Sequence, residues 1–157
     1  MGNWTPETLS FFELLFRIIF AALVGLILGL ERDIKGKPVG FTSYMIVCIA
    51  SALISIISLE LTHEMTVRGN VQLDPLRVIE GVLTGIGFLG AAAIVTKHEN
   101  NVVGDTTASG IWASGGLGIA IGFGFYEMAA VAALAILLIF ISEKIQRKVT
   151  KANKAKN

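Results

Sequence analysis

The sequence is dominated by apolar runs of roughly 15–25 residues, the length that an α-helix needs to cross about 30 Å of hydrocarbon. Hydrophobic residues make up 54% of the 157 residues, and only 16% are charged. The helices of a soluble bundle would each carry a polar stripe. Here, in contrast, Leu23–Leu30, Met45–Ile57 and Val131–Ile141 are apolar or small all the way round. The pattern predicts a membrane protein.

The runs predict an all-α, polytopic fold of about five transmembrane helices. We expect these helices at roughly Leu9–Leu30, Phe41–Leu59, Asp74–Thr96, Thr106–Gly122 and Glu127–Ile141. The last boundary is the hardest to place, because a turn or a re-entrant element could fill residues 122–126. The expected organisation is an N-terminal segment (1–8), a five-helix transmembrane domain (9–142) and a basic tail (143–157).

Basic residues favour the first loop, the third loop and the tail. Arg32, Lys35 and Lys37 lie in the first loop and Lys97 in the third. Basic residues favour the cytoplasmic side of a membrane, and an odd number of crossings places these segments on one side. We therefore expect the N-terminus outside and the C-terminus inside, with the tail close to anionic lipid headgroups. The net charge of +1 gives no sign of nucleic-acid binding.

The sequence gives little support for an enzyme. Cys48 is the single cysteine and lies in an apolar run, so neither a disulfide framework nor a cysteine metal site is expected. His63 and His98 are expected to be loop residues at the surface. Gly85-x-Gly87-x-x-Gly90 resembles a dinucleotide fingerprint but lacks the preceding strand.

Charged residues beside a membrane span are costly and invite a functional explanation. Glu13 and Arg17 are four residues apart, so we expect an ion pair near the outer interface or a polar site facing the bundle interior. Glu31 stands at a helix end, where the helix dipole disfavours an acid. This placement suggests that Arg32 or a cation holds Glu31.

Two further patterns have a functional interpretation. In the first, Asp74 and Pro75 are expected to begin a helix, and the glycines that follow predict either tight helix packing or exposed carbonyls along a pathway. In the second, Asp105 is expected to cap the fourth helix together with the adjacent threonines, and Trp112 is expected to pack inside the bundle. These two patterns and the charged segment around Glu31 give three groups of candidate functional residues. The residues selected are Glu31, Arg32, Lys37, Pro38, Asp74, Arg77, Gly85, Gly87, Gly90, Thr106, Thr107 and Trp112.

Mg²⁺ prefers oxygen ligands, so the carboxylates near the membrane surfaces are candidate metal ligands. Glu31, Asp74 and Asp105 are the residues selected. They fall on opposite faces of the membrane in the expected topology and cannot form one site, although they could line the two mouths of a pathway.

Together these patterns resemble those of the MgtC/SapB family of bacterial inner-membrane proteins. The resemblance rests on Gly29-Leu-Glu-Arg32 with Gly36-Lys-Pro-Val-Gly40, then Asp74-Pro-x-Arg77-Val and Gly85-Ile-Gly-Phe-Leu-Gly90-Ala, then Thr106-Thr-Ala with Trp112. The chain departs from the usual family pattern at Thr42, Tyr44, Gly81 and Asp105, where Arg, His, Gln and Leu are common. It is expected to be a short member without the ACT-like C-terminal domain.

The resemblance implies a bacterial plasma-membrane protein tied to adaptation to low magnesium and, in pathogens, to survival inside macrophages. It leaves two hypotheses for this chain. The first is a regulator that contacts other membrane proteins, such as the F-type ATP synthase, through its helices. The second is a transporter or channel for Mg²⁺ or another cation, formed as a homo-oligomer. No resident cofactor is expected apart from a possible Mg²⁺ ion.

Overall fold

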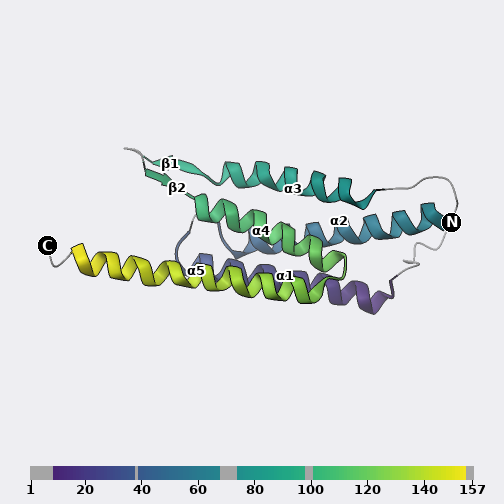
Figure 1. The fold of residues 1–157 in the computed structure, drawn as a ribbon, viewed down its shortest axis with the longest axis horizontal. Coiled ribbons are helices and arrows are strands. Elements are labelled where there is room, and N and C mark those ends of the chain that lie inside the picture. The colour runs from purple at the N-terminus through teal and green to yellow at the C-terminus, as the bar shows by residue number, and fades with distance from the viewer. Residues whose placement is uncertain (1–8, 38, 68–73, 98–100, 155–157) are drawn as a thin grey trace.

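A computed structural model of the chain describes residues 9–37, 39–67, 74–97 and 101–154 (Figure 1). Its helices are α1 (Phe11–Ile34), α2 (Phe41–Val67), α3 (Pro75–Ala92), α4 (Asp105–Gly122) and α5 (Tyr126–Lys154). The five expected helices are therefore confirmed. A short antiparallel hairpin, β1 (Val95–Lys97) and β2 (Asn101–Val103), joins α3 to α4 and was not expected.

Successive helices run in alternating directions (Figure 1). The α1–α2 loop, the hairpin and the end of α5 lie at one end of the bundle. The beginning of α1, the end of α2 and the α4–α5 turn lie at the other. The three segments with an excess of basic residues thus share one end, as the charge pattern predicts.

Three of the described helices, α1, α2 and α3, are long and apolar enough to cross a membrane. α5 contributes a shorter apolar stretch, Tyr126–Ser142. α4 has the most buried residues of the five and is rich in glycine and serine. A helix enclosed by protein needs less apolar surface than one facing lipid, which explains this composition.

Several helix ends differ from the expected ones. α1 runs one turn further, to Ile34, so Glu31 and Arg32 are helical. α2 continues to Val67, and the segment expected to be a polar connection is its last part. There the hydroxyl of Thr62 donates to the carbonyl of Ser58 at 2.7 Å, which satisfies a polar group without breaking the helix. α3 stops at Ala92, because the chain then enters the hairpin.

Glycine pairs set the close contacts of α2 with its neighbours. A Cβ added at Gly25 of α1 would lie 2.7 Å from the Cα of Met45, and one at Gly29 would meet the Cα of Phe41. On α4, a Cβ at Gly118 would meet the carbonyl oxygen of Cys48. Small residues allow backbones this close, so α2 is packed tightly between α1 and α4.

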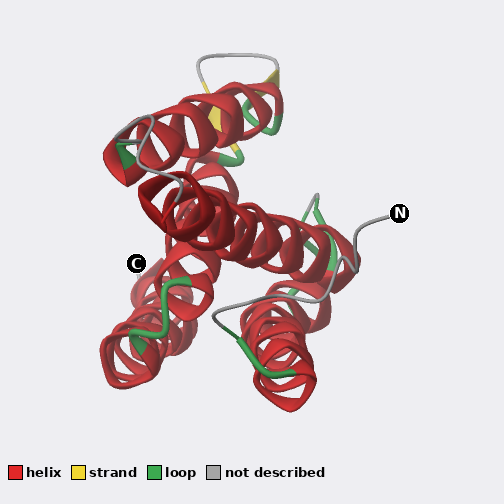
Figure 2. Cartoon of the chain, turned by 90° about the vertical axis from the view of Figure 1, so that its right-hand side faces the viewer, coloured by secondary structure: helices red, strands yellow, loops and turns green. Residues whose placement is uncertain are grey.

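α3 lies at the edge of the molecule. It packs mainly on α4 and to a lesser extent on α2. The view along the bundle shows the strands at the same edge (Figure 2). At the opposite end of α4, the tight turn into α5 passes through Gly124 at φ 87°, a conformation that favours glycine.

Candidate functional site

Arg32 is completely buried in the last turn of α1. Its Nη2 donates to Oγ1 of Thr107 in α4 at 3.5 Å. Its guanidinium carbon lies 4.6 Å from the centroid of the Phe140 ring in α5. A cation over the face of an aromatic ring is stabilised by the ring's electrostatic field, more strongly when water is excluded. One side chain thus joins three helices.

Tyr44 brings α2 to the same place. It is also fully buried, and its hydroxyl donates to the backbone carbonyl of Thr107 at 3.3 Å. Gly110 leaves room for this hydroxyl, because a Cβ there would meet the Tyr44 Oη. Thr107 therefore accepts from Arg32 through its side chain and from Tyr44 through its backbone.

Glu31 supplies the acid of the cluster. Its carboxylate forms an ion pair with Lys35 and lies 3.9 Å from Nη1 of Arg32. Lys35 also donates to the carbonyl oxygen of Phe140. The hypothesis that a partner holds Glu31 is confirmed, with Lys35 as a partner that the sequence reading did not name. We call these six residues the Arg32 cluster: Glu31, Arg32, Lys35, Tyr44, Thr107 and Phe140.

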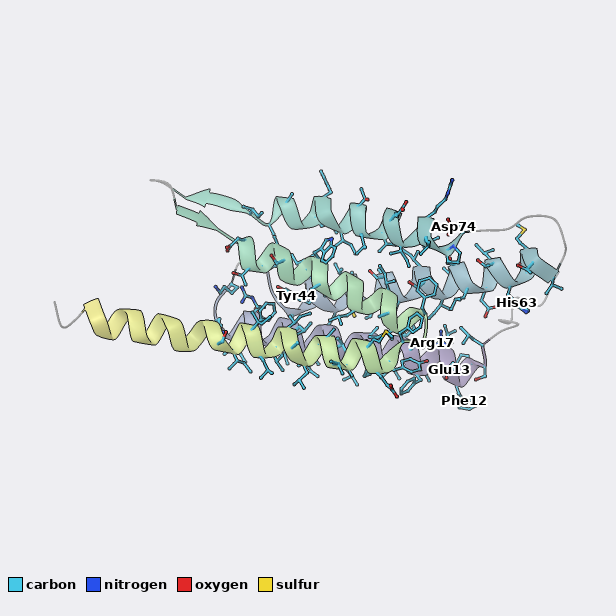
Figure 3. All side chains as sticks on the ribbon, in the orientation of Figure 1. Phe12, Glu13, Arg17, Tyr44, His63 and Asp74 are labelled. Carbon is cyan, nitrogen blue, oxygen red and sulfur yellow. The ribbon has the colours of Figure 1, made fainter. Side chains whose placement is uncertain are left out.

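A second polar cluster lies at the other end of the bundle, where Figure 3 shows Glu13 and Arg17 beside the α4–α5 turn. Nε of Arg17 lies 3.0 Å from Oε1 of Glu13, and Nη1 donates to the carbonyl of Gly122 at 2.6 Å. The hydroxyl of Tyr126 donates to Glu13. The expected ion pair is confirmed, and because Arg17 is buried it also faces the bundle interior.

The candidate metal ligands are not brought together. Asp74 lies at the same end of the bundle as Glu13 and Arg17 (Figure 3), where its Oδ1 accepts from the backbone N–H of Leu76 at 2.9 Å as the predicted N-cap of α3. Glu31 and Asp105 lie at the other end, and Glu31 is neutralised by basic side chains. Among the described residues there is no group of three or more His, Cys, Asp or Glu side chains that could hold a metal ion.

Two expectations for α4 are wrong. The N-cap is Gly104, at φ 109° and without a side-chain cap, while Asp105 is an exposed first-turn residue that accepts from the Thr106 hydroxyl at 3.3 Å. Its charge there still suits the helix dipole. Trp112 is 49% exposed. The buried side of α4 includes Ile111 and Ser114, and Trp112 points away from it.

The other selected residues have varied positions. Gly90 packs as expected, since a Cβ there would lie 3.3 Å from the carbonyl oxygen of Ala108. Gly85 and Gly87 have nothing within 4 Å of such a Cβ, so the expectation of tight packing is wrong for them within the described chain. Arg77 is exposed. The backbone N–H of Lys37 donates to the carbonyl of Arg32 at 3.1 Å. Pro38 lies outside the described residues.

A family model described as MgtC family matches residues 18–148, most of the chain. The chain belongs to the MgtC family. Its relatives include an uncharacterised protein of Haemophilus influenzae, 38% identical over 92% of this chain and 60% of that protein. Another is Protein SapB of Bacillus subtilis, 34% identical over 80% of this chain and 54% of that protein.

A third relative is named "Putative magnesium transporter YhiD" in Escherichia coli, and it is 35% identical over 81% of this chain and 59% of that protein. This MgtC-family chain therefore spans between 54% and 60% of the length of these three relatives. No solved structure matches it.

The sequence reading of this MgtC-family chain missed part of the Arg32 cluster. Lys35 had a local signal, because it is four residues after Glu31 on the same helix face. Tyr44 appeared only as a departure from the family pattern. Phe140 had no local signal, since it is one of many apolar residues in α5 and reaches Arg32 only through the packing of α5 against α1.

Proposed function

We propose that this MgtC-family chain is a bacterial inner-membrane regulator that acts through helix–helix contact with other membrane proteins during adaptation to magnesium limitation. In this proposal all five helices cross the membrane, with the N-terminus outside and the C-terminus inside. The family resemblance suggests the F-type ATP synthase as one partner.

The open glycines of α3 carry the proposal. A Cβ added at Gly81, Gly85 or Gly87 would meet nothing within 4 Å. Each glycine costs a helix about 0.8–1.0 kcal/mol relative to alanine, so a row of them without a packing role is a net cost. Small residues let another helix approach closely in a membrane, which is the role that would offset this cost.

The state of the carboxylates favours contact over transport. Glu31 is held by Lys35 and Arg32, and Asp74 caps α3. These two acids already stabilise the fold of this chain. A cation that entered a pathway would have to displace Lys35 and Arg32 from Glu31, or the backbone N–H from Asp74.

Gly85→Leu tests the proposal in cells that depend on the chain for growth at low magnesium. Leucine fits the open space at this position, so we expect normal expression and an unchanged melting temperature. We also expect loss of ATP-synthase co-purification and of growth at low magnesium. Ala135→Leu, at an exposed position of α5, is the matched control and should behave as wild type. Wild-type growth and co-purification by Gly85→Leu would sink the proposal.

Magnesium transport is the second candidate, because a relative 35% identical to this chain carries that name. The pathway would then lie between copies in a homo-oligomer, with Glu31, Asp74 and Asp105 at its mouths. Mg²⁺ uptake into proteoliposomes tests this directly, with Glu31→Gln as the comparison. Uptake no faster than in protein-free vesicles, for both proteins, would exclude it.

A further inference from the structure

The two sides of α3 differ in polarity. The side turned towards the rest of the bundle is aliphatic, formed by the buried Ile86 and the half-buried Val78, Ile79, Val82 and Leu83. The opposite side is exposed and combines two charges and a hydroxyl with small and large apolar residues: Arg77, Glu80, Thr84, Gly81, Gly85, Gly87, Ala91, Leu76, Phe88 and Leu89. We call this second side the outer face of α3.

The exposed sides of α1 and α5 are more uniformly apolar. α1 exposes aliphatic residues such as Leu15, Ile19 and Leu23, and α5 exposes Val131 and Leu134. Such surfaces suit hydrocarbon, in which polar groups are expensive. The exposed side of α3 differs from them because it carries an acid and a base among its apolar residues.

Arg77 and Glu80 make the contrast sharper. Neither side chain has an ion-pair partner among the described residues. Glu80 is six residues from Asp74, about 9 Å along the helix at 1.5 Å per residue, so in a membrane-spanning α3 its carboxylate would lie within the apolar segment. A charge there is normally paired or faces protein. We therefore expect another protein surface, with charges opposite to those of Arg77 and Glu80, to pack against the outer face of α3.

We propose that the cover is a second copy of this chain. Two α3 helices would run parallel about a two-fold axis, with Arg77 of each copy paired to Glu80 of the other. The two residues are three positions apart, about 4.5 Å along the axis, which the long arginine side chain can span. The two-fold axis repeats every contact, so one face with both charges is complementary to itself.

The remaining residues of the outer face suit the same arrangement. Thr84 is four residues after Glu80 and seven after Arg77, so it lies on the same side of the helix as both, and its hydroxyl donates to the carbonyl of Glu80 at 2.7 Å. The exposed Gly87 and Ala91 follow Thr84 on that side, and small residues let two transmembrane helices approach closely. Thr84 would lie near the two-fold axis. This inference rests on the proposed function in treating α3 as a contact surface. It assigns the side with Arg77, Glu80 and Thr84 to a second copy, and it leaves the side with Gly81 and Gly85 to the other membrane protein.

Disulfide trapping in native membranes tests the pairing. Thr84→Cys is expected to give an oxidant-dependent dimer of this chain. Val131→Cys, which lies on the lipid-facing side of α5 and is 70% exposed in its native form, should give none. Cys48 can stay in place because it is buried. No dimer from Thr84→Cys, or a cross-link to a different protein only, would overturn the proposal.

Charge reversal tests the ion pairs. In the Thr84→Cys background, Arg77→Glu and Glu80→Arg should each abolish the dimer, because each places like charges opposite one another. The double variant Arg77→Glu with Glu80→Arg restores both pairs and should restore the dimer. Melting temperatures of the single variants establish that they fold. A folded single variant that still dimerises fully, or a double variant that does not recover, would contradict the pairing.

The outcomes separate this inference from the proposed function. If Thr84→Cys forms no dimer while Gly85→Leu still loses low-magnesium growth, the second copy is wrong and the contact function stands. If the dimer forms while Gly85→Leu leaves growth at low magnesium and co-purification unchanged, the pairing is right and the proposed function fails.

Discussion

The guanidinium group of Arg32 lies over the ring of Phe140, which joins the end of the first helix to the last helix of the bundle. The hydroxyl of Thr107 and the carboxylate of Glu31 also lie beside this buried cation. An unpaired buried charge is strongly destabilising, so the helices that supply these groups must pack together for Arg32 to be tolerated. The stability of the Arg32 cluster therefore depends on the correct packing of the four helices that supply its residues.

Phe140→Leu should destabilise the bundle more than its loss of apolar area alone would suggest. Leucine keeps the site apolar but removes the ring face beneath Arg32, and a desolvated cation–π contact contributes about 2 kcal/mol. Thermal unfolding in detergent measures the effect. Leu138→Ala, at an exposed position two residues away, should shift the melting temperature less. An equal or larger shift for Leu138→Ala would contradict this role of Phe140.

Thr107→Val and Tyr44→Phe should each destabilise the chain more than Thr106→Val. Thr107→Val removes the hydroxyl that accepts from Arg32, and Tyr44→Phe removes a buried hydroxyl that donates to the Thr107 carbonyl and interacts with Arg32. A lost buried hydrogen bond costs about 0.5–1.5 kcal/mol. Thr106→Val is the control, because its hydroxyl bonds to the exposed Asp105. The three melting temperatures test this, and a larger effect at Thr106 than at Thr107 or Tyr44 would show that the cluster is misassigned.

Gly118→Ala and Gly116→Ala should have opposite effects although they are two residues apart. A Cβ at Gly118 would meet the carbonyl oxygen of Cys48, whereas one at Gly116 has nothing within 4 Å. Overpacking typically costs 1–3 kcal/mol, while alanine in open helical space gains up to about 1 kcal/mol over glycine. We expect a lower melting temperature for Gly118→Ala and an unchanged or higher one for Gly116→Ala. Equal shifts would argue against the close contact of α2 with α4.

Arg17→Met should loosen the α4–α5 turn. The methionine keeps much of the apolar stem but removes the charged donor to the Gly122 carbonyl and the partner of Glu13. A charged hydrogen bond of this kind is worth about 1.5–3 kcal/mol. Hydrogen exchange at the amides of Phe123 and Phe125 should become faster, while the amides of α2 near Tyr44 should be unaffected. Unchanged exchange in the turn would mean that Arg17 does not hold it.

The sequence predicted what depends on local pattern. Five helices, the N-cap at Asp74 and the Glu13–Arg17 pair follow from periodicity, spacing and capping chemistry within a few residues. The end of α1 was placed too early because Glu31 and Arg32 look like loop charges when the groups that bury them are unknown. Those groups, Thr107 and Phe140, come from α4 and α5, and only the packed fold brings them to Arg32.

The errors at Trp112 and Gly85 have one cause. Residue type alone does not tell which side of a membrane helix faces protein, because lipid and a protein core are equally apolar. The tryptophan suggested an interior position, and the row of glycines suggested either tight packing or exposed carbonyls. In the structure Trp112 and Gly85 are both open. For α3, the difference in polarity between its two sides indicates which side contacts another protein. This difference can be recognised only when the buried side is known.

The enclosure of α4 has a consequence for how the chain is made. α4 is not among the helices apolar enough to cross a membrane by composition, yet in the proposed five-span arrangement it lies in the middle of the bundle. Its glycines and serines would be a poor signal to the insertion machinery if α4 were presented alone. In that arrangement the earlier helices would have to be in place to receive α4, so membrane integration would be sequential. Substitutions in α2 that disturb its packing against α4 would then reduce the amount of protein integrated into the membrane. This loss would precede any effect on the activity of the mature protein.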